Sequence, residues 1–234
     1  MNQTRGYINR ILLVMVPLLF MSYGLANDIY VTQSGDTLDL DITQDGQNNT
    51  VGNSSTASSS TGATTTLNID QIGNSNVITY QINGATYTGV INLVGNSNNV
   101  DLNCDSTGNN SSCGTANAVI NFTGNSNDID LDIGQTASAN NADVDIVGQS
   151  GSDSNVVAAT VDGNSAILTI TVNGDTNNWL IDMDGNGDIN GHTLIHTHTG
   201  GIADVDIVQS GVNDQMITLT TSGDNHDIDI QQTD

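Results

Sequence analysis

Oxygen-bearing side chains occupy alternate positions along the segment that begins at Asp182, a spacing that could hold a metal ion. Asp182, Asp184, Asn186 and Asp188 lie at every second position. Calcium-binding loops place carboxylate and carbonyl oxygens in this way. The twelfth position of such a loop is Thr193 instead of a bidentate Glu, and the preceding residues have the pattern of a strand. We therefore weigh a Ca²⁺ site here against an ordinary solvated turn, and expect no other cofactor.

Three histidines follow within a short stretch and could bind a transition metal. His196 and His198 would share one face of a strand, with His192 nearby, and neutral imidazole is a common metal ligand. No Cys, Glu or third ligand in the same phase accompanies them. We expect polar surface histidines in preference to a metal centre.

Aspartates separated by one residue recur along the chain, and two carboxylates are enough for glycoside hydrolysis. These aspartates alternate with apolar residues and do not cluster at one place, which is typical of a solvated outer face. Alternative hypotheses are that stacked carboxylates bind divalent cations, or that their repulsion gates assembly. Because residues 27–234 contain no Lys or Arg to neutralise an acidic sugar, we expect no enzyme. The aspartates are Asp39, Asp41, Asp128, Asp130, Asp132, Asp143, Asp145, Asp182, Asp184, Asp204, Asp206, Asp227 and Asp229.

The chain has two cysteines, Cys104 and Cys113. In an exported protein they most simply form a disulfide, which would contribute about 2 to 3 kcal/mol. Free thiols are the alternative.

Residues 1–26 have the features of a secretory signal peptide. They contain both basic residues, Arg5 and Arg10, and an apolar run over 11–23 that ends in small residues before a cleavage site at Ala26. The run is short for a membrane span, and no second one follows. We expect residues 27–234 to be exported as one repeat domain that inserts into no membrane.

The acidic composition excludes two classes of partner. All 26 acidic residues are aspartates, and the net charge is −24. Such a surface repels nucleic acid and anionic membranes, so neither is expected to bind.

Glycines recur at a constant interval, as at Gly73, Gly84 and Gly95, and the Gly-Asn-Ser-Asn sequence at Gly73 returns at Gly95 and Gly124. Between glycines, apolar or amide residues occupy alternate positions, which is typical of a half-buried strand followed by a bend. One such unit cannot bury its apolar face alone, so the units must stack. The sequence therefore predicts an all-β fold, a two-sided parallel β-solenoid (β-helix) with coils of about 22 residues, two glycine intervals each, and loop insertions.

The recurring residues have structural roles in this prediction. Inward Asn and Gln side chains would form ladders in which each amide bonds to its equivalent one coil away. Glycine would supply the positive φ of the tight bends. The residues are Gln33, Gly35, Gln44, Gly46, Asn49, Gln71, Gly73, Asn76, Gly84, Gly95, Asn98, Gly124, Asn127, Gly163, Gly174, Asn177, Gly185, Gln209 and Gly211.

Four segments lose the alternating phase and are predicted to be loop insertions. They are residues 52–66, 103–117, 134–142 and 186–203.

Residues 44–49 and 71–76 each have the sequence Gln-x-Gly-x-x-Asn, which resembles the core of curlin repeats, the subunits of bacterial curli fibres. The resemblance covers most of residues 27–234 through the shared repeat period, although Leu93 and Phe122 stand where the family has Gln. It implies an extracellular functional amyloid at the cell surface that adds further copies of itself to its open ends. Biofilm matrix formation and surface adhesion would be its roles. A curli-type nucleator and secretion machinery would be its partners.

The alternative hypothesis is a monomeric solenoid adhesin that binds Ca²⁺ or carbohydrate, with loops covering both ends. An ice- or carbohydrate-binding solenoid would need a flat, regular array of threonines. Residues 64–66 and 218–221 hold only local groups of threonine.

Overall fold

The structure is a computed structural model that describes residues 27–46, 48–52, 57–73, 75–95, 97–104, 113–134, 141–149, 151–162, 165–184, 192–211 and 215–233. The predicted signal peptide, Gly163 and Gly185 lie outside these residues. The described residues form 17 β-strands and no helix. They accordingly contain no helix that is long and apolar enough to cross a membrane.

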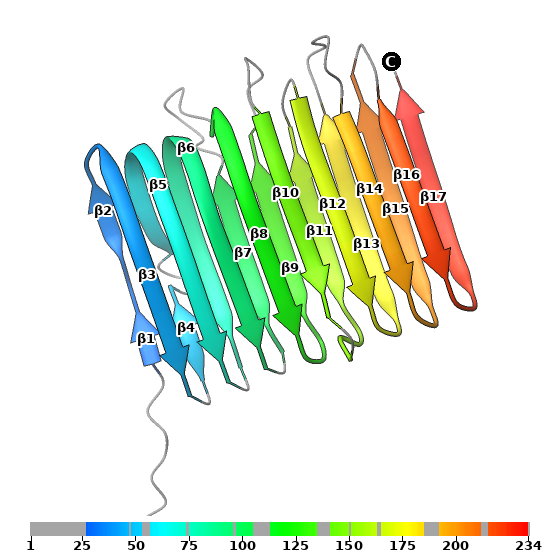
Figure 1. Cartoon of the computed structure of the whole chain (residues 1–234), viewed down its shortest axis with the longest axis horizontal. Coiled ribbons are helices and arrows are strands. Elements are labelled where there is room, and N and C mark those ends of the chain that lie inside the picture. The colour runs from blue at the N-terminus through cyan, green and yellow to red at the C-terminus, as the bar shows by residue number, and fades with distance from the viewer. Residues whose placement is uncertain are drawn as a thin grey trace, which may run out of the picture.

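Two parallel ladders of strands form the two faces of a flattened solenoid, and the chain passes from one face to the other at each bend (Figure 1). Strands β5 and β6 run through a bend and belong to both faces. In stacking order the first face contains β1 (Asn27–Ile29) with β2 (Thr32–Ser34), β4 (Asn49–Val51) with the start of β5 (Ser58–Ile72), the start of β6 (Val77–Val94), β7 (Asn99–Cys104), β9 (Asp128–Ile133), β11 (Val156–Val161), β13 (Asn177–Asp184), β15 (Ala203–Ser210) and β17 (His226–Thr233). The second face contains β3 (Thr37–Asp45), the remainders of β5 and β6, β8 (Thr115–Thr123), β10 (Asn141–Gly148), β12 (Ser165–Asn173), β14 (His192–Thr199) and β16 (Met216–Ser222).

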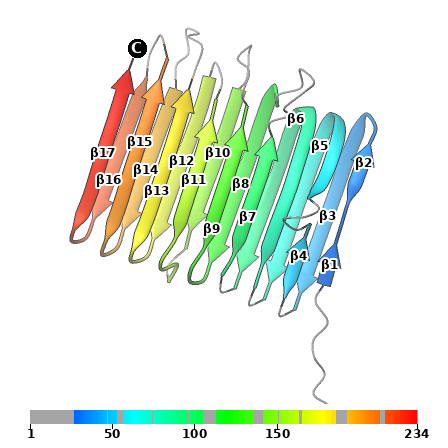
Figure 2. The same cartoon turned by 180° about the vertical axis from the view of Figure 1, so that it is seen from behind.

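The predicted two-sided parallel β-solenoid is therefore confirmed. The view from behind shows the same order of coils, from the blue N-terminal end to the red C-terminal end (Figure 2).

Alternate residues of each strand point between the two faces and form columns that run along the solenoid. One column on the second face contains Ile69, Ile91, Ile120, Ile146 and Ile170, each in register with the next and fully buried. Each side chain packs against an identical one a single coil away. The core is thus a thin slab that continues from coil to coil, stabilised by removal of apolar surface from water.

Coils have the predicted length only where both bends are tight. Ser58 pairs with Tyr80, which lies two glycine intervals later, whereas Thr86 pairs with Thr115, which lies well beyond that distance along the chain. The mean spacing is roughly 26 residues, longer than predicted. The in-register pairing is kept because the additional residues enter at bends and leave the strands unchanged.

The two bends differ in how much they vary. The bend that leads from the second face to the first, called here the asparagine bend, joins β3 to β4, β8 to β9 and β12 to β13 through a few residues. The opposite bend, called here the variable bend, is continuous strand within β5 and β6 but longer between β7 and β8 and between β13 and β14. Most of the added length therefore lies along one edge of the solenoid.

Two of the predicted insertions contain strands that the sequence pattern missed. Strand β5 begins at Ser58, and β14 covers residues 192–199 within the segment predicted to be a loop at 186–203. In β5 the inward residues at this point are Ser58, Ser60 and Thr65, all buried. The Oγ of Ser58 accepts a hydrogen bond from the Val31 N–H at 3.0 Å. The inward residues of this strand are therefore small hydroxyl side chains, and a search for alternating apolar residues does not detect it.

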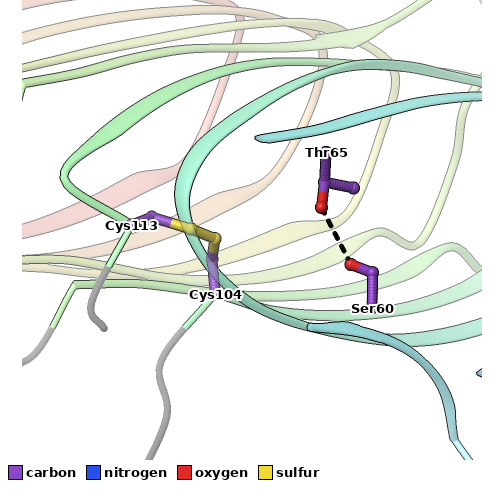
Figure 3. The surroundings of a disulfide bond; sticks show 4 residues. All are labelled: Ser60, Thr65, Cys104 and Cys113. Carbon is purple, nitrogen blue, oxygen red and sulfur yellow. Dashed lines mark hydrogen bonds between the residues drawn. A yellow bond between two sulfur atoms is a disulfide. The ribbon is translucent and has the colours of Figure 1, made fainter. Parts of the chain in front are cut away.

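A disulfide joins Cys104 at the end of β7 to Cys113, just before β8, across the variable bend (Figure 3). The two Cα atoms are 5.8 Å apart, and both side chains are buried. Two coils earlier, the hydroxyl oxygens of Ser60 and Thr65 lie 3.0 Å apart across the same bend. The disulfide thus ties the two faces together where the connection is long.

Candidate functional site

A column of buried asparagines closes the asparagine bend in successive coils. Asn98, Asn127, Asn155 and Asn177 form a chain in which each Nδ2 donates to the Oδ1 of the next at 2.5 to 2.6 Å. The Nδ2 of Asn127 also donates to the carbonyl oxygen of Gly124 at 2.7 Å, and the others make the equivalent bond to the backbone of their own bends. The Gly-x-x-Asn spacing therefore caps each bend and bonds it to the next coil. Asn155 was missed because Ser152 replaces the glycine of the motif.

The first members of the column bond differently. The Nδ2 of Asn49 donates to the carbonyl oxygens of Gln44 and Ile72 at 2.8 and 2.9 Å, and Asn76 makes the equivalent backbone bonds. Asn49 and Asn76 therefore cap their bends through backbone carbonyls. In the described part of the chain, neither one donates to the side-chain amide of another asparagine.

Glutamine ladders are short and lie near the two ends of the solenoid. The Nε2 of Gln71 donates to the Oε1 of Gln44 at 2.6 Å, and the Nε2 of Gln232 donates to that of Gln209 at 3.2 Å. Gln33 pairs in register with Ser60 and not with another amide. The predicted ladders are thus formed by some of the predicted residues, with Gln232 an addition.

Most bend glycines are required by the close approach of neighbouring backbones. A Cβ on Gly73 would lie 1.8 Å from the carbonyl oxygen of Gly46, and one on Gly95 would lie 1.6 Å from that of Gly73. Left-handed φ values instead occur later in the motif, at Ser97 (62°) and Ser126 (60°). The prediction that glycine supplies positive φ is therefore wrong for Gly73 and Gly95. Close approach also occurs at Gly62, Gly84, Gly174, Gly200 and Gly223, while Gly124 and Gly211 do have positive φ.

The histidines of β14 point inward and are buried, so the predicted surface location is wrong. His196 continues the isoleucine column after Ile170. Its ring packs edge-on against Trp179, with centroids 5.0 Å apart, and neither ring nitrogen has a hydrogen-bond partner in the described part of the chain. Burial lowers the pKa of His196 from 6.5 to about 4.

His198 ends the chain of asparagine amides. Its Nε2 lies 2.6 Å from the Nδ2 of Asn177, and its ring lies edge-on to His226 with centroids 5.3 Å apart. Burial lowers the pKa of His198, while a hydrogen bond to the Gly174 carbonyl opposes this. The imidazole therefore takes the position of the next side-chain amide.

The described residues contain no group of three or more His, Cys, Asp or Glu side chains placed to hold a metal ion. Of the four residues in the calcium hypothesis, Asp182 is exposed on β13 and Asp184 ends that strand. Asn186 and Asp188 lie outside the described residues. The calcium hypothesis therefore stays a prediction.

Aspartates point outward, as the alternation predicts, and several are paired with asparagines one coil away. The Nδ2 of Asn68 donates to Asp41 at 2.8 Å, and that of Asn92 donates to Asp70 at 2.6 Å. Burial raises the pKa of Asp130, and the charge of Asp132 raises it further. Asp41 and Asp70 therefore each have an amide as the neighbour one coil away, whereas Asp101 and Asp130 stack directly on each other.

The two ends of the solenoid expose side chains that are buried in every inner coil. Ile181, Ile207 and Ile230 form one column, and they are 0%, 1% and 48% exposed, respectively. At the other end, Ile29 is partly buried, whereas Val51, its partner one coil on, is fully buried. Within the described residues, nothing covers the outer edges of the terminal strands. These ends form the candidate functional site.

No family model matches the chain, and neither a curated protein nor a solved structure shows significant similarity to it.

Proposed function

We propose that this chain is a secreted, curlin-like structural protein that assembles end to end into extracellular amyloid fibres, for biofilm matrix and surface adhesion. The proposal rests first on the Gln-x-Gly-x-x-Asn repeats, which resemble those of curlins. The open ends described above support it.

The structural observation that supports end-to-end assembly is the exposed core at the C-terminal end. A strand edge with unpaired N–H and C=O groups is a template for another chain, and soluble proteins usually cover or charge such edges. Strands β16 and β17 have such edges, and their inward apolar residues lie beside them. Ile217 and Ile228 are only partly buried, and Ile230 is 48% exposed. A further copy would pair these backbone groups and bury these side chains together.

A protein with this function would act outside the cell, after export of residues 27–234 through secretion machinery. A curli-type nucleator would supply the first template. Ions need not take part in the chemistry, because the interaction uses backbone hydrogen bonds and apolar burial.

The proposal is tested by thioflavin fluorescence and negative-stain microscopy of purified residues 27–234, which contain the whole described fold. We expect unbranched, dye-positive fibres from the unchanged chain. Replacing two inward residues of β16 in I217D/L219D places carboxylates in the exposed core, so growth should fall at least tenfold.

The matched control is T218D/T220D, which adds the same charge on the outward face of the same strand. At high salt, where the added outward charge is screened, it should grow within about threefold of the unchanged chain. Circular dichroism checks that both variants retain β-structure. A chain that stays monomeric at high concentration would overturn the proposal and favour the monomeric adhesin. Equal growth of the two variants would overturn end-to-end assembly through the exposed core of β16.

A further inference from the structure

The two faces of the described solenoid contain different numbers of strand levels. A level is one position in the stack, such as β13 or the pair β1 and β2. The first face has nine levels, from β1 with β2 to β17, and the second has eight, from β3 to β16. The described chain therefore consists of an odd number of half-coils, nine on one face and eight on the other.

An odd number of half-coils determines how a second copy can continue the stack. The strands of the two faces share one alternating pattern, so a half-turn about the solenoid axis brings the strands of one face onto the positions of the other, although the two bends differ in length. The last strand, β17, lies on the first face, so the next vacant position lies on the second face beside β16. A copy in the same orientation would place its β1 on β17 and leave that position empty.

We propose that successive copies in the fibre are related by a half-turn about the fibre axis, so that β1 and β2 of one copy pair with β16 of the copy before it. Strand β3 of the incoming copy then pairs with β17. This inference rests on the proposed function and defines which surfaces of the two ends meet.

The inward columns match across such a junction. The phase set by the glycine interval aligns Ile29 of the incoming copy with Ile217, and Val31 with Leu219. On the other face, Leu40 of the incoming copy aligns with Ile228. All these residues are apolar and are only partly buried in the single copy. Each would gain the environment that its column has in the inner coils.

The glutamine ladders also meet at this junction. Gln44 of the incoming copy aligns with Gln232 of the copy before it. Because Gln44 already bonds Gln71 and Gln232 already bonds Gln209, the junction would join two separate pairs into one ladder of four amides. The short ladders at the ends thus become a single continuous one.

The path of the chain agrees with this arrangement. Strand β17 ends at the variable bend, and β1 begins at the asparagine bend, at opposite edges of the solenoid (Figure 1). A half-turn places the start of β1 in the incoming copy beside the end of β17. The first strand of the incoming copy then follows the last strand of the copy before it, as one coil follows another within a single chain.

Two cysteine pairings distinguish the half-turn from stacking in the same orientation. Both use D28C, an exposed position on β1. In the half-turn arrangement residue 28 is next to Met216, whereas in same-orientation stacking it is next to Asp227. Strand neighbours about 4.8 Å apart are within the range of Cα distances for a disulfide. Because the native disulfide is buried, it should not exchange with the new cysteines.

The experiment mixes purified D28C with either M216C or D227C in residues 27–234, grows fibres, oxidises them and measures dimers on a non-reducing gel. We expect dimer in the D28C and M216C mixture to approach half of the chain, which is the most that random incorporation of two equal variants allows. The D28C and D227C mixture should give no more dimer than each variant alone. Cryo-electron microscopy should also show an axial rise of about 41 Å per copy, because each half-coil adds about 2.4 Å, half the spacing between strands.

The outcomes separate this inference from the proposed function. Fibres that cross-link through D227C, or through neither variant, would overturn the half-turn while leaving fibre assembly intact. The absence of fibres from the unchanged chain would overturn both.

Discussion

At the scale of single residues, Asn127 has the most connected position in the asparagine column. Its Nδ2 donates to Gly124 and Asn155, and its Oδ1 accepts from Asn98. Replacing it with alanine leaves buried carbonyl groups without partners, so N127A should lower the unfolding free energy by about 2 to 4 kcal/mol. The measurement is denaturant unfolding of the freshly purified monomer at pH 7.

Asn125 provides the control, because it lies in the same bend with an exposed side chain and contributes its backbone carbonyl to a bond with Ser97. N125A should change stability by no more than about 0.5 kcal/mol. Equal unfolding free energies for N127A and N125A would show that the asparagine column does not stabilise the fold.

Burial of His196 makes the unfolding free energy of the solenoid depend on pH. Its pKa is lowered from 6.5 to about 4 in the folded chain, so below pH 6.5 the unfolded chain takes up a proton that the folded chain does not. Stability should therefore fall by roughly 3 kcal/mol as the pH drops from 6.5 to about 4, and level off below that. H196L restores an apolar residue to the column and should remove this loss.

The comparison is between the pH profiles of unfolding free energy for the two monomers. Burial also raises the pKa of Asp101 and Asp130, which favours the folded state as the pH falls, but both proteins contain these residues. The difference between the profiles therefore isolates His196. Parallel profiles would show that its burial has no energetic consequence.

At the scale of elements, the glycine interval and the alternation between glycines predicted the two faces, the parallel stacking and the direction of the side chains, because period-two alternation directly reports a half-buried strand. The prediction failed where inward positions are polar. The start of β5 places Ser58 and Ser60 in the core, and β14 places His196 there. Both sets of residues are typical of loops or surfaces, and only the neighbouring coils determine that they are buried.

Two other features could not be read from a single repeat. The roughly 26-residue mean spacing results from the variable bend, whose length does not affect strand register. The open ends depend on which residues have no neighbour, a property of the whole stack. Ile230 has the same sequence pattern as Ile207, yet one is 48% exposed and the other 1%.

At the scale of the whole molecule, stacked charge opposes the proposed junction. Asp204 lies in register with Asp227, and Asp206 with Asp229. In the half-turn arrangement Asp39 and Asp41 of the next copy extend these two columns, so that three carboxylates follow one another in each. Fibre growth should therefore be slow at low salt and several-fold faster at high salt, since the screening length falls from about 30 Å at 0.01 M to about 3 Å at 1 M.

Two charge variants locate this repulsion. D227N/D229N removes carboxylates at the junction, and D143N/D145N removes the same charge from an inner coil. In thioflavin growth curves at about 0.01 M salt, where screening is weak, the first variant should grow several-fold faster and the second should stay near the unchanged chain. Equal acceleration would mean that net charge alone, and not the junction, sets the rate.

Fibre diffraction from aligned fibres of residues 27–234 shows whether the solenoid ends template assembly. If the ends template assembly, the strands lie across the fibre and the meridian shows a reflection at about 4.8 Å. We expect this reflection from the unchanged chain, and a much weaker one from I217D/L219D samples incubated for the same time, because fewer fibres form. A β-rich monomer that forms no fibres, or fibres without a meridional reflection at about 4.8 Å, would contradict this expectation.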